Sequence, residues 1–116
     1  MATQQLERSQ WETYFDRVSR TLVGINVEIE TASLKLGDQI NQEWSLLNGL
    51  TYDPKDDIFE VATDELDHLI PHPRNIFVDE AGVMLRSVDV IDADGNHQVV
   101  KLREPLPLPP ARPAPL

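Results

Sequence analysis

Residues 11–30 read WETYFDRVSRTLVGINVEIE, and the spacing of their apolar side chains changes halfway along. In the first half these side chains recur every three or four residues, as on one face of a helix: Trp11, Tyr14, Phe15, Val18 and Leu22. From Ile25 onward they alternate with polar residues, which is typical of a strand with one wet face. The stretch therefore predicts a helix followed by a strand, with the apolar face of the helix covering a sheet.

Flanking residues indicate where this helix begins and ends. Ser9 and Glu12 have the spacing of a capping box, so we expect the helix to begin there. Gly24 suits the left-handed conformation that often follows a helix.

Turn signals divide most of the remaining chain into short apolar runs. They occur at Asp53-Pro-Lys-Asp-Asp57, Asp79-Glu-Ala-Gly82 and Asp92-Ala-Asp-Gly95, and they predict successive hairpins. Residues 37–49 fit either a helix or a loop and strand, and we favour the second. A short helix is expected near residues 64–70. The fold class is thus α+β, with the N-terminal helix packed on a mainly antiparallel sheet of five or six strands.

The length of 116 residues suits one domain, which we place at residues 1–104. Residues 105–116 are rich in proline and predict a disordered C-terminal tail, although Pro107 to Arg112 also matches a PxxPxR ligand motif. Apolar residues fall on both faces of the strand expected at 83–91. That pattern suggests a homodimer through the face that the helix leaves bare.

Net charge is −10, and residues 25–92 carry fifteen acids and only four bases. Such a surface repels nucleic acid and anionic lipid and favours a basic protein partner. The chain has no cysteine, which excludes disulfides and thiolate chemistry, and we find neither a signal peptide nor a membrane span. We therefore expect a cytoplasmic protein.

His68 and His72 form the pattern that most resembles a metal site, because two histidines four residues apart can hold one metal ion when they lie on a helix. Pro71 and Pro73 forbid that helix, so the spacing of the two histidines fits a shared metal ion but the backbone geometry does not. We expect His68 to be structural and His72 to lie in an extended segment. Candidate binding residues in this region are Asp67, His68, His72 and Arg74.

Other motifs argue against an enzyme and against a bound cofactor. The chain has five glycines and no phosphate-binding loop or nucleophile elbow. Residues 92–96 begin like a calcium loop, but the twelfth position is Arg103 instead of a glutamate, which favours a hairpin turn. No residue is assigned a catalytic or metal-binding role.

Several segments together resemble an uncharacterised family of short acidic bacterial proteins, a domain of unknown function. The resemblance runs from about Leu6 to Pro105 and is carried by Val27-Glu-Ile-Glu30, Leu36-Gly-Asp-Gln39, Tyr52-Asp-Pro-Lys-Asp-Asp57, Leu66-Asp-His-Leu-Ile70 with His72-Pro-Arg74, Val78-Asp-Glu80 and Asp92-Ala-Asp-Gly95. It implies a bacterial domain and assigns no activity to any residue.

From these features we expect a small, acidic, non-enzymatic module that binds a protein partner through its sheet. The alternative is a small metal-dependent hydrolase or metal-binding protein that uses His68 and His72.

Overall fold

The computed structural model describes residues 2–22, 24–33 and 37–107, and within them it describes every side chain except those of residues 2, 38 and 41–43. The chain runs through β1 (Ala2–Leu6), a 3-10 turn (Arg8–Gln10) and helix α1 (Trp11–Arg20). Seven more strands follow: β2 (Asn26–Ser33), β3 (Gly37–Asp53), β4 (Ile58–Thr63), β5 (Asp67–Pro71), β6 (Asn75–Ala81), β7 (Met84–Ile91) and β8 (His97–Pro107).

Helix α1 presents the apolar face that the sequence predicts. Trp11, Tyr14, Phe15 and Val18 are buried, and Leu22 packs beside them just after the helix. The predicted cap at Ser9 is wrong, because Ser9 lies inside the 3-10 turn and the side chain of Gln10 instead accepts a hydrogen bond from the Glu7 amide at 3.2 Å. Gly24 has a φ of 62°, in the left-handed region as expected.

The strands form one eight-stranded sheet in the order β1-β6-β7-β8-β2-β3-β4-β5 among the described residues, and every neighbouring pair is antiparallel. The α+β class and the antiparallel pairing are confirmed, whereas the predicted five or six strands are too few. Two additional strands explain most of the difference. The mainly polar segment of β1 has only one large apolar residue, Leu6, and β5 occupies a segment expected to be helical.

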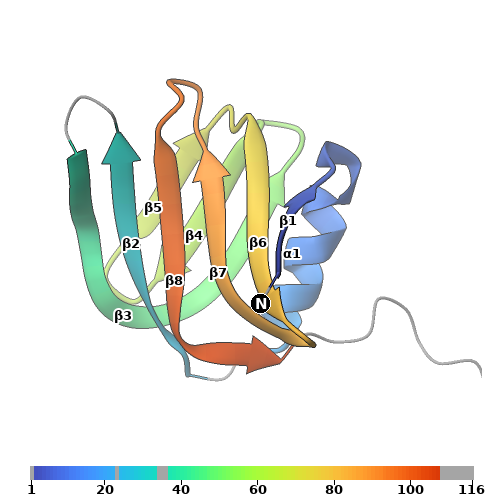
Figure 1. Ribbon diagram of the computed structural model, residues 1–116, viewed down its shortest axis with the longest axis vertical. Helices are drawn as coiled ribbons and strands as arrows, with labels where there is room; N and C mark the ends of the chain where they lie inside the picture. The colour runs from blue at the N-terminus through green and yellow to red at the C-terminus, as the bar shows by residue number, and fades with distance from the viewer. Residues whose placement is uncertain (1, 23, 34–36, 108–116) are drawn as a thin grey trace, which may run out of the picture.

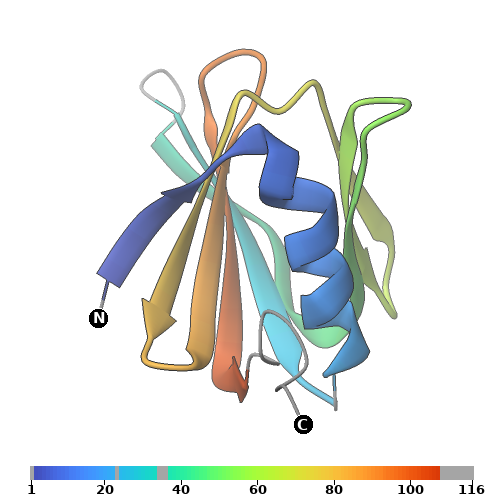
Figure 2. The same ribbon diagram turned by 90° about the vertical axis from the view of Figure 1, so that its right-hand side faces the viewer.

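Strand β3 bends the sheet around the helix. Its first part pairs with β2 and its second part pairs with β4, so one strand belongs to both halves of the sheet. In Figure 1, β3 curves so that β4 and β5 lie behind β2, β8 and β7. Figure 2 shows α1 between these two halves, with β6, β7 and β8 on one side and β4 and β5 on the other.

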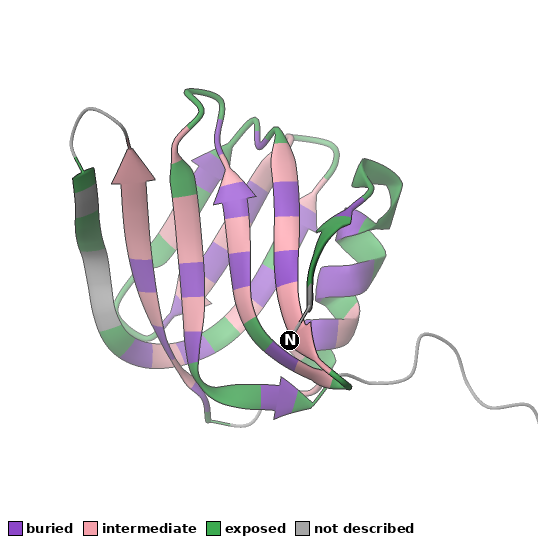
Figure 3. Cartoon of the chain, viewed as in Figure 1, coloured by how far each residue is buried: buried purple, intermediate pink, exposed green. Residues whose placement is uncertain are grey.

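The hydrophobic core fills the space between α1 and the two halves of the sheet. Phe15 and Phe59 are both fully buried, and their rings meet edge to face with centroids 4.8 Å apart. Along the strands, buried positions alternate with more exposed ones (Figure 3), as the sequence pattern requires. The opposite face of β6, β7 and β8 carries no helix among the described residues, and the dimer expected there stays a prediction.

The predicted helix near residues 64–70 is wrong. The Thr63 amide donates to the Leu66 carbonyl at 3.1 Å, and the Leu66 amide donates to the Thr63 hydroxyl at 3.2 Å. These bonds close a tight turn, after which Asp67–Pro71 pairs with residues 58–62 of β4. Strand pairing with β4 has overridden the local helical tendency.

At the C-terminus, β8 continues through Pro107, and Leu106 is fully buried. The rest of the expected tail, residues 108–116, lies outside the described residues.

Candidate functional site

The structure places His68 and His72 in different surroundings. His68 lies on β5, and its Nε2 is 3.1 Å from Oε1 of Gln98. His72 follows the end of that strand, and its Nδ1 is 3.1 Å from Oδ2 of Asp57. The expected extended conformation at His72 is wrong, since its φ is 52°. The chain turns at this residue, so the ring of His72 faces Asp57 and not Gln98, the partner of His68.

His68 belongs to a polar cluster that joins the two halves of the sheet. Gln98 on β8 accepts from the Thr31 hydroxyl at 3.0 Å and donates to Oδ2 of Asp92 at 2.9 Å. Oδ1 of Asp92 accepts from the amides of Asp94 and Asn96, which closes the turn between β7 and β8. The prediction of a hairpin turn instead of a calcium loop is confirmed. His68, on β5, contacts the end of this hairpin at Gln98.

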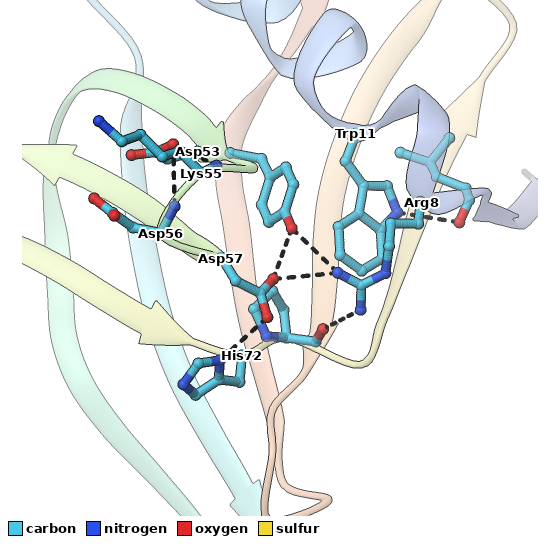
Figure 4. Close-up of polar contacts among 10 residues, drawn as sticks. Arg8, Trp11, Asp53, Lys55, Asp56, Asp57 and His72 are labelled. Atoms are coloured by element: carbon cyan, nitrogen blue, oxygen red, sulfur yellow. Dashed lines mark hydrogen bonds and ion pairs between the residues drawn. The ribbon is translucent and has the colours of Figure 1, made fainter.

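Three segments meet at the carboxylate of Asp57, as Figure 4 shows. Oδ1 accepts from the Tyr52 hydroxyl at 2.6 Å and from the Arg8 guanidinium at 3.2 Å, while Oδ2 faces His72. Arg8 also donates to the Tyr52 hydroxyl at 3.1 Å and to the Pro73 carbonyl at 2.9 Å. We call Arg8, Tyr52, Asp57 and His72 the Asp57 clamp, because together they tie the N-terminal 3-10 turn to the ends of two strand connections.

Aromatic rings pack against two members of the Asp57 clamp, Arg8 and Tyr52. The Arg8 guanidinium lies 4.4 Å from the centre of the Trp11 ring, and the Trp11 ring meets Tyr52 edge to face at 5.0 Å. Trp11 Nε1 donates to the Leu6 carbonyl at 3.2 Å. The start of α1 thereby holds the cation of the clamp over a buried ring.

Backbone strain coincides with the clamp. Asp57 and His72, with φ of 55° and 52°, have positive φ although they are not glycine, and within the described residues they share this property with no other non-glycine residue. Asp and His tolerate this region better than most residues, and a left-handed residue still costs energy. The His72 amide donates to the Asp57 carbonyl at 2.8 Å, so each strained residue holds the other in place.

The ionisation of Asp57 and Tyr52 favours the hydrogen bond between them. Hydrogen bonds from Tyr52 and then from His72 lower the pKa of Asp57, with a smaller contribution from Arg8. Burial and the bond to Asp57 raise the pKa of Tyr52. At neutral pH Asp57 is therefore an ionised acceptor and Tyr52 is a protonated donor. The arrangement is that of a structural clamp.

A second group of acids lies at the β5 edge of the sheet. Residues 52–72 contain seven acids and one lysine, which is more than half of the chain's net charge. Burial raises the pKa of Glu60 on β4, and the adjacent Asp67 on β5 raises it further through its charge and a hydrogen bond. Beside this pair, Leu69 is 53% exposed. We call Glu60, Asp67 and Leu69 the β5 edge patch.

Sequence reasoning identified His72 and Asp67 but missed most of the clamp. The sequence marks Asp57 only as part of a turn, although its position across that hairpin turn from Tyr52 is a usable signal. Arg8 is 49 residues from Asp57, and no sequence pattern points to that contact. Arg74 is exposed, and its amide donates to the Ile91 carbonyl at 2.8 Å.

The described residues contain no group of three or more His, Asp and Glu residues that could hold a metal ion. They also contain no helix long and apolar enough to cross a membrane.

Comparison with known proteins places the chain in a family. A family model described as a family of unknown function (DUF5335) matches residues 2–111. An uncharacterised protein of the bacterium Aquifex aeolicus (strain VF5) is 41% identical over 110 residues, which cover 94% of this chain and 99% of that protein. No solved structure matches the chain. The resemblance predicted from the sequence is thus confirmed, and the chain belongs to the DUF5335 family of unknown function.

Proposed function

We propose that this protein is a non-enzymatic module of the bacterial cytoplasm that binds an extended basic segment of a partner protein along strand β5. The observation that carries the proposal is the β5 edge patch. It combines the open edge of a sheet with two adjoining carboxyl groups and an exposed leucine. Asp67, His68, His72 and Arg74, the residues singled out from the sequence, lie on or next to this strand.

The position of β5 supports strand addition. β5 is the last strand in the sheet order and pairs only with β4 among the described strands, so its other side can accept a further strand. Pro71 at its end has no amide hydrogen, which confines this pairing to residues 67–70. In a strand added here, alternate side chains would lie on the same outer face as the β5 edge patch.

The charge of the patch selects the partner. Glu60 and Asp67 repel each other, and a lysine or arginine placed between them would favour ionisation of both. The same charge opposes pairing of two β5 edges from two copies of the chain, because acidic edges would face each other. A basic segment with apolar residues at intervening positions complements both the carboxyl pair and Leu69.

Metal binding by His68 and His72, the alternative expected from the sequence, finds no support in their contacts. Gln98 faces one of the rings and Asp57 the other. A shared ion would require both side chains to leave these partners.

A designed peptide tests the proposal directly. A peptide of about six residues that alternates lysine and valine is titrated into the labelled protein, and backbone amide shifts and affinity are measured at about 50 and 300 mM NaCl. We expect shifts centred on residues 67–70, weaker binding at high salt, and no binding of the matched glutamate–valine peptide.

Two double variants with equal charge changes complete the test. Glu60→Gln with Asp67→Asn should lower the affinity for the basic peptide by about tenfold or more. Glu12→Gln with Asp16→Asn, on the exposed side of α1, should change it by less than about twofold. Equal losses in the two double variants, or shifts away from β5, would refute strand addition at this edge.

A further inference from the structure

A groove of about 370 Å³ lies on the sheet face turned away from α1, in the half of the sheet that does not contain β5. Six of its lining residues matter for its chemistry: Trp44, Asp79, Arg86, Ser87, Lys101 and Arg103. Pockets of 300 Å³ or more are of the size that small-molecule ligands occupy. This groove therefore has room for a molecule of one or two rings.

Irregular strand pairing produces the hollow. Leu85 pairs with Leu106 and Ser87 pairs with Lys101, so the register advances by two residues on β7 and by five on β8. The surplus residues of β8 bulge away from the ladder at this point. A second register shift on the same face lies between Asp79 and the next residue of β6. Bulges redirect side chains and are enriched beside functional sites.

The groove concentrates positive charge on an acidic protein. Arg86, Lys101 and Arg103 are three of the ten basic residues, and they line one hollow in a chain of net charge −10. Lys101 Nζ contacts Oε1 of Glu30 at 2.9 Å and Oε1 of Glu28 at 3.9 Å, so these glutamates offset its charge and recognition of an anion falls to the two arginines. Arginine side chains bind planar carboxylates in two-point geometry.

Trp44 adds a flat apolar surface to these cations. Its side chain is 43% exposed, and the Arg103 guanidinium lies 5.7 Å from its ring centre. A planar ring could stack on the exposed indole while its anionic group meets the adjacent guanidinium. The two residues come from strands separated by β2, and their exposed side chains meet across it.

Asp79 supplies an acceptor that is not used within the described residues. Its Oδ1 atom is shielded from solvent and has no hydrogen-bond partner there. A buried carboxylate oxygen without a donor is destabilising, and most such atoms are paired. The Asp79 side chain as a whole is half-buried, so a rotation of its carboxylate turns this oxygen toward the groove, where a ligand N–H group would provide the missing donor.

We propose that this groove binds a small planar organic anion whose ring carries an N–H donor. The anion meets Arg86 and Arg103, the ring stacks on Trp44, and the N–H group donates to Asp79. This site is separate from the β5 edge patch, and neither proposal depends on the other.

Orotate serves as the probe because it combines a flat ring, a carboxylate and ring N–H groups. Binding is measured by calorimetry and by amide shifts, beside N,N-dimethylorotate, benzoate and inorganic phosphate. We expect orotate to bind with Kd below about 1 mM and to shift residues 86–87 and 101–103. Trp44→Ala and Arg103→Ala should each weaken binding by about tenfold. Arg20→Ala, which removes an exposed cation of α1 outside the groove, should have less than a twofold effect.

The contribution of Asp79 is tested by combining ligand and variant. Methylation of the ring nitrogens should weaken binding about tenfold in the native chain and not at all in Asp79→Ala. The proposal is overturned if no planar anion binds at about 5 mM, if phosphate binds as well as orotate, or if Trp44→Ala leaves orotate binding unchanged. Circular dichroism of each variant checks that the fold is intact, and a variant that does not fold is replaced by Trp44→Leu or Arg103→Gln.

Discussion

Replacing Asp57 by Asn should destabilise the protein by about 1–2 kcal/mol at neutral pH. Asn keeps the shape of the side chain and tolerates the left-handed φ of 55°, so the substitution mainly removes charge. The Tyr52 hydroxyl, on a side chain only 4% exposed, then loses an ionised acceptor at 2.6 Å. A hydrogen bond to a charged group contributes about 1 kcal/mol more than a neutral one.

The remaining loss comes from Arg8, whose ion pair with Asp57 is partly solvated. The two side chains are 53% and 32% exposed, so this contribution is limited to about 0–1 kcal/mol. For a chain of this size, the combined loss corresponds to a decrease in Tm of about 3–10 °C. Urea denaturation followed by circular dichroism measures the free energy of unfolding directly.

The pH dependence gives the same prediction a second readout. Because the pKa of Asp57 is lowered in the folded state, its contribution is present above the unfolded pKa of about 3.9 and is lost as pH falls through the folded pKa. The gap between the native chain and Asp57→Asn should therefore close in acid. Asp56→Asn, an exposed neighbour on the same turn, is the matched control. A loss below about 0.3 kcal/mol, or an equal loss in the control, would refute the clamp.

Three further substitutions test the core, the β5 edge and the backbone. Phe15→Ala should cost about 3–5 kcal/mol in urea denaturation, because the ring is fully buried against Phe59; a cost under 1 kcal/mol would contradict this packing. Glu60→Gln should raise the free energy of unfolding at pH 7 by up to about 1 kcal/mol. The pKa of Glu60 is raised in the folded state, so the native glutamate lowers stability only as the pH rises from the unfolded pKa through the folded pKa. The advantage of the variant should therefore disappear below the unfolded pKa near 4.3. Gly82→Ala should lower Tm, because φ is 63° at this residue. Gly49→Ala should not lower Tm, since its added methyl group would meet only the Ser19 hydroxyl at 3.9 Å. Equal Tm values for the two variants would count against the left-handed turn at Gly82.

Local patterns were sufficient for the parts of the fold that depend on local chemistry. The apolar face of α1 follows from helical spacing, and the hairpin turn at Asp92 follows from an aspartate that can bond its own turn amides. Strand β1 could not be found this way, because Leu6 is the only buried residue among its described side chains, at positions 3–6. The turn at Thr63 could not be predicted either, because it depends on the pairing of the following residues, 67–71, with β4.

The candidate site was less accessible to sequence reasoning for the same reason. The prolines correctly excluded a helical pair of histidines, but they did not indicate where His72 would turn. Its partner is fixed by the meeting of two loops, and Arg8 arrives from the other end of the chain. Such a contact depends on the bend of β3, which brings β4 and β5 around α1.

That bend also determines where ligands can be recognised. The space between the two halves of the sheet is filled by α1 and by side chains such as Trp11, Phe15 and Phe59, which are no more than 1% exposed. The two binding surfaces that we propose both lie outside this packed interior, with a basic groove on one half of the sheet and an acidic edge on the other. Because the two surfaces have opposite charge and lie on opposite halves, salt should weaken both interactions while each set of variants affects only its own ligand.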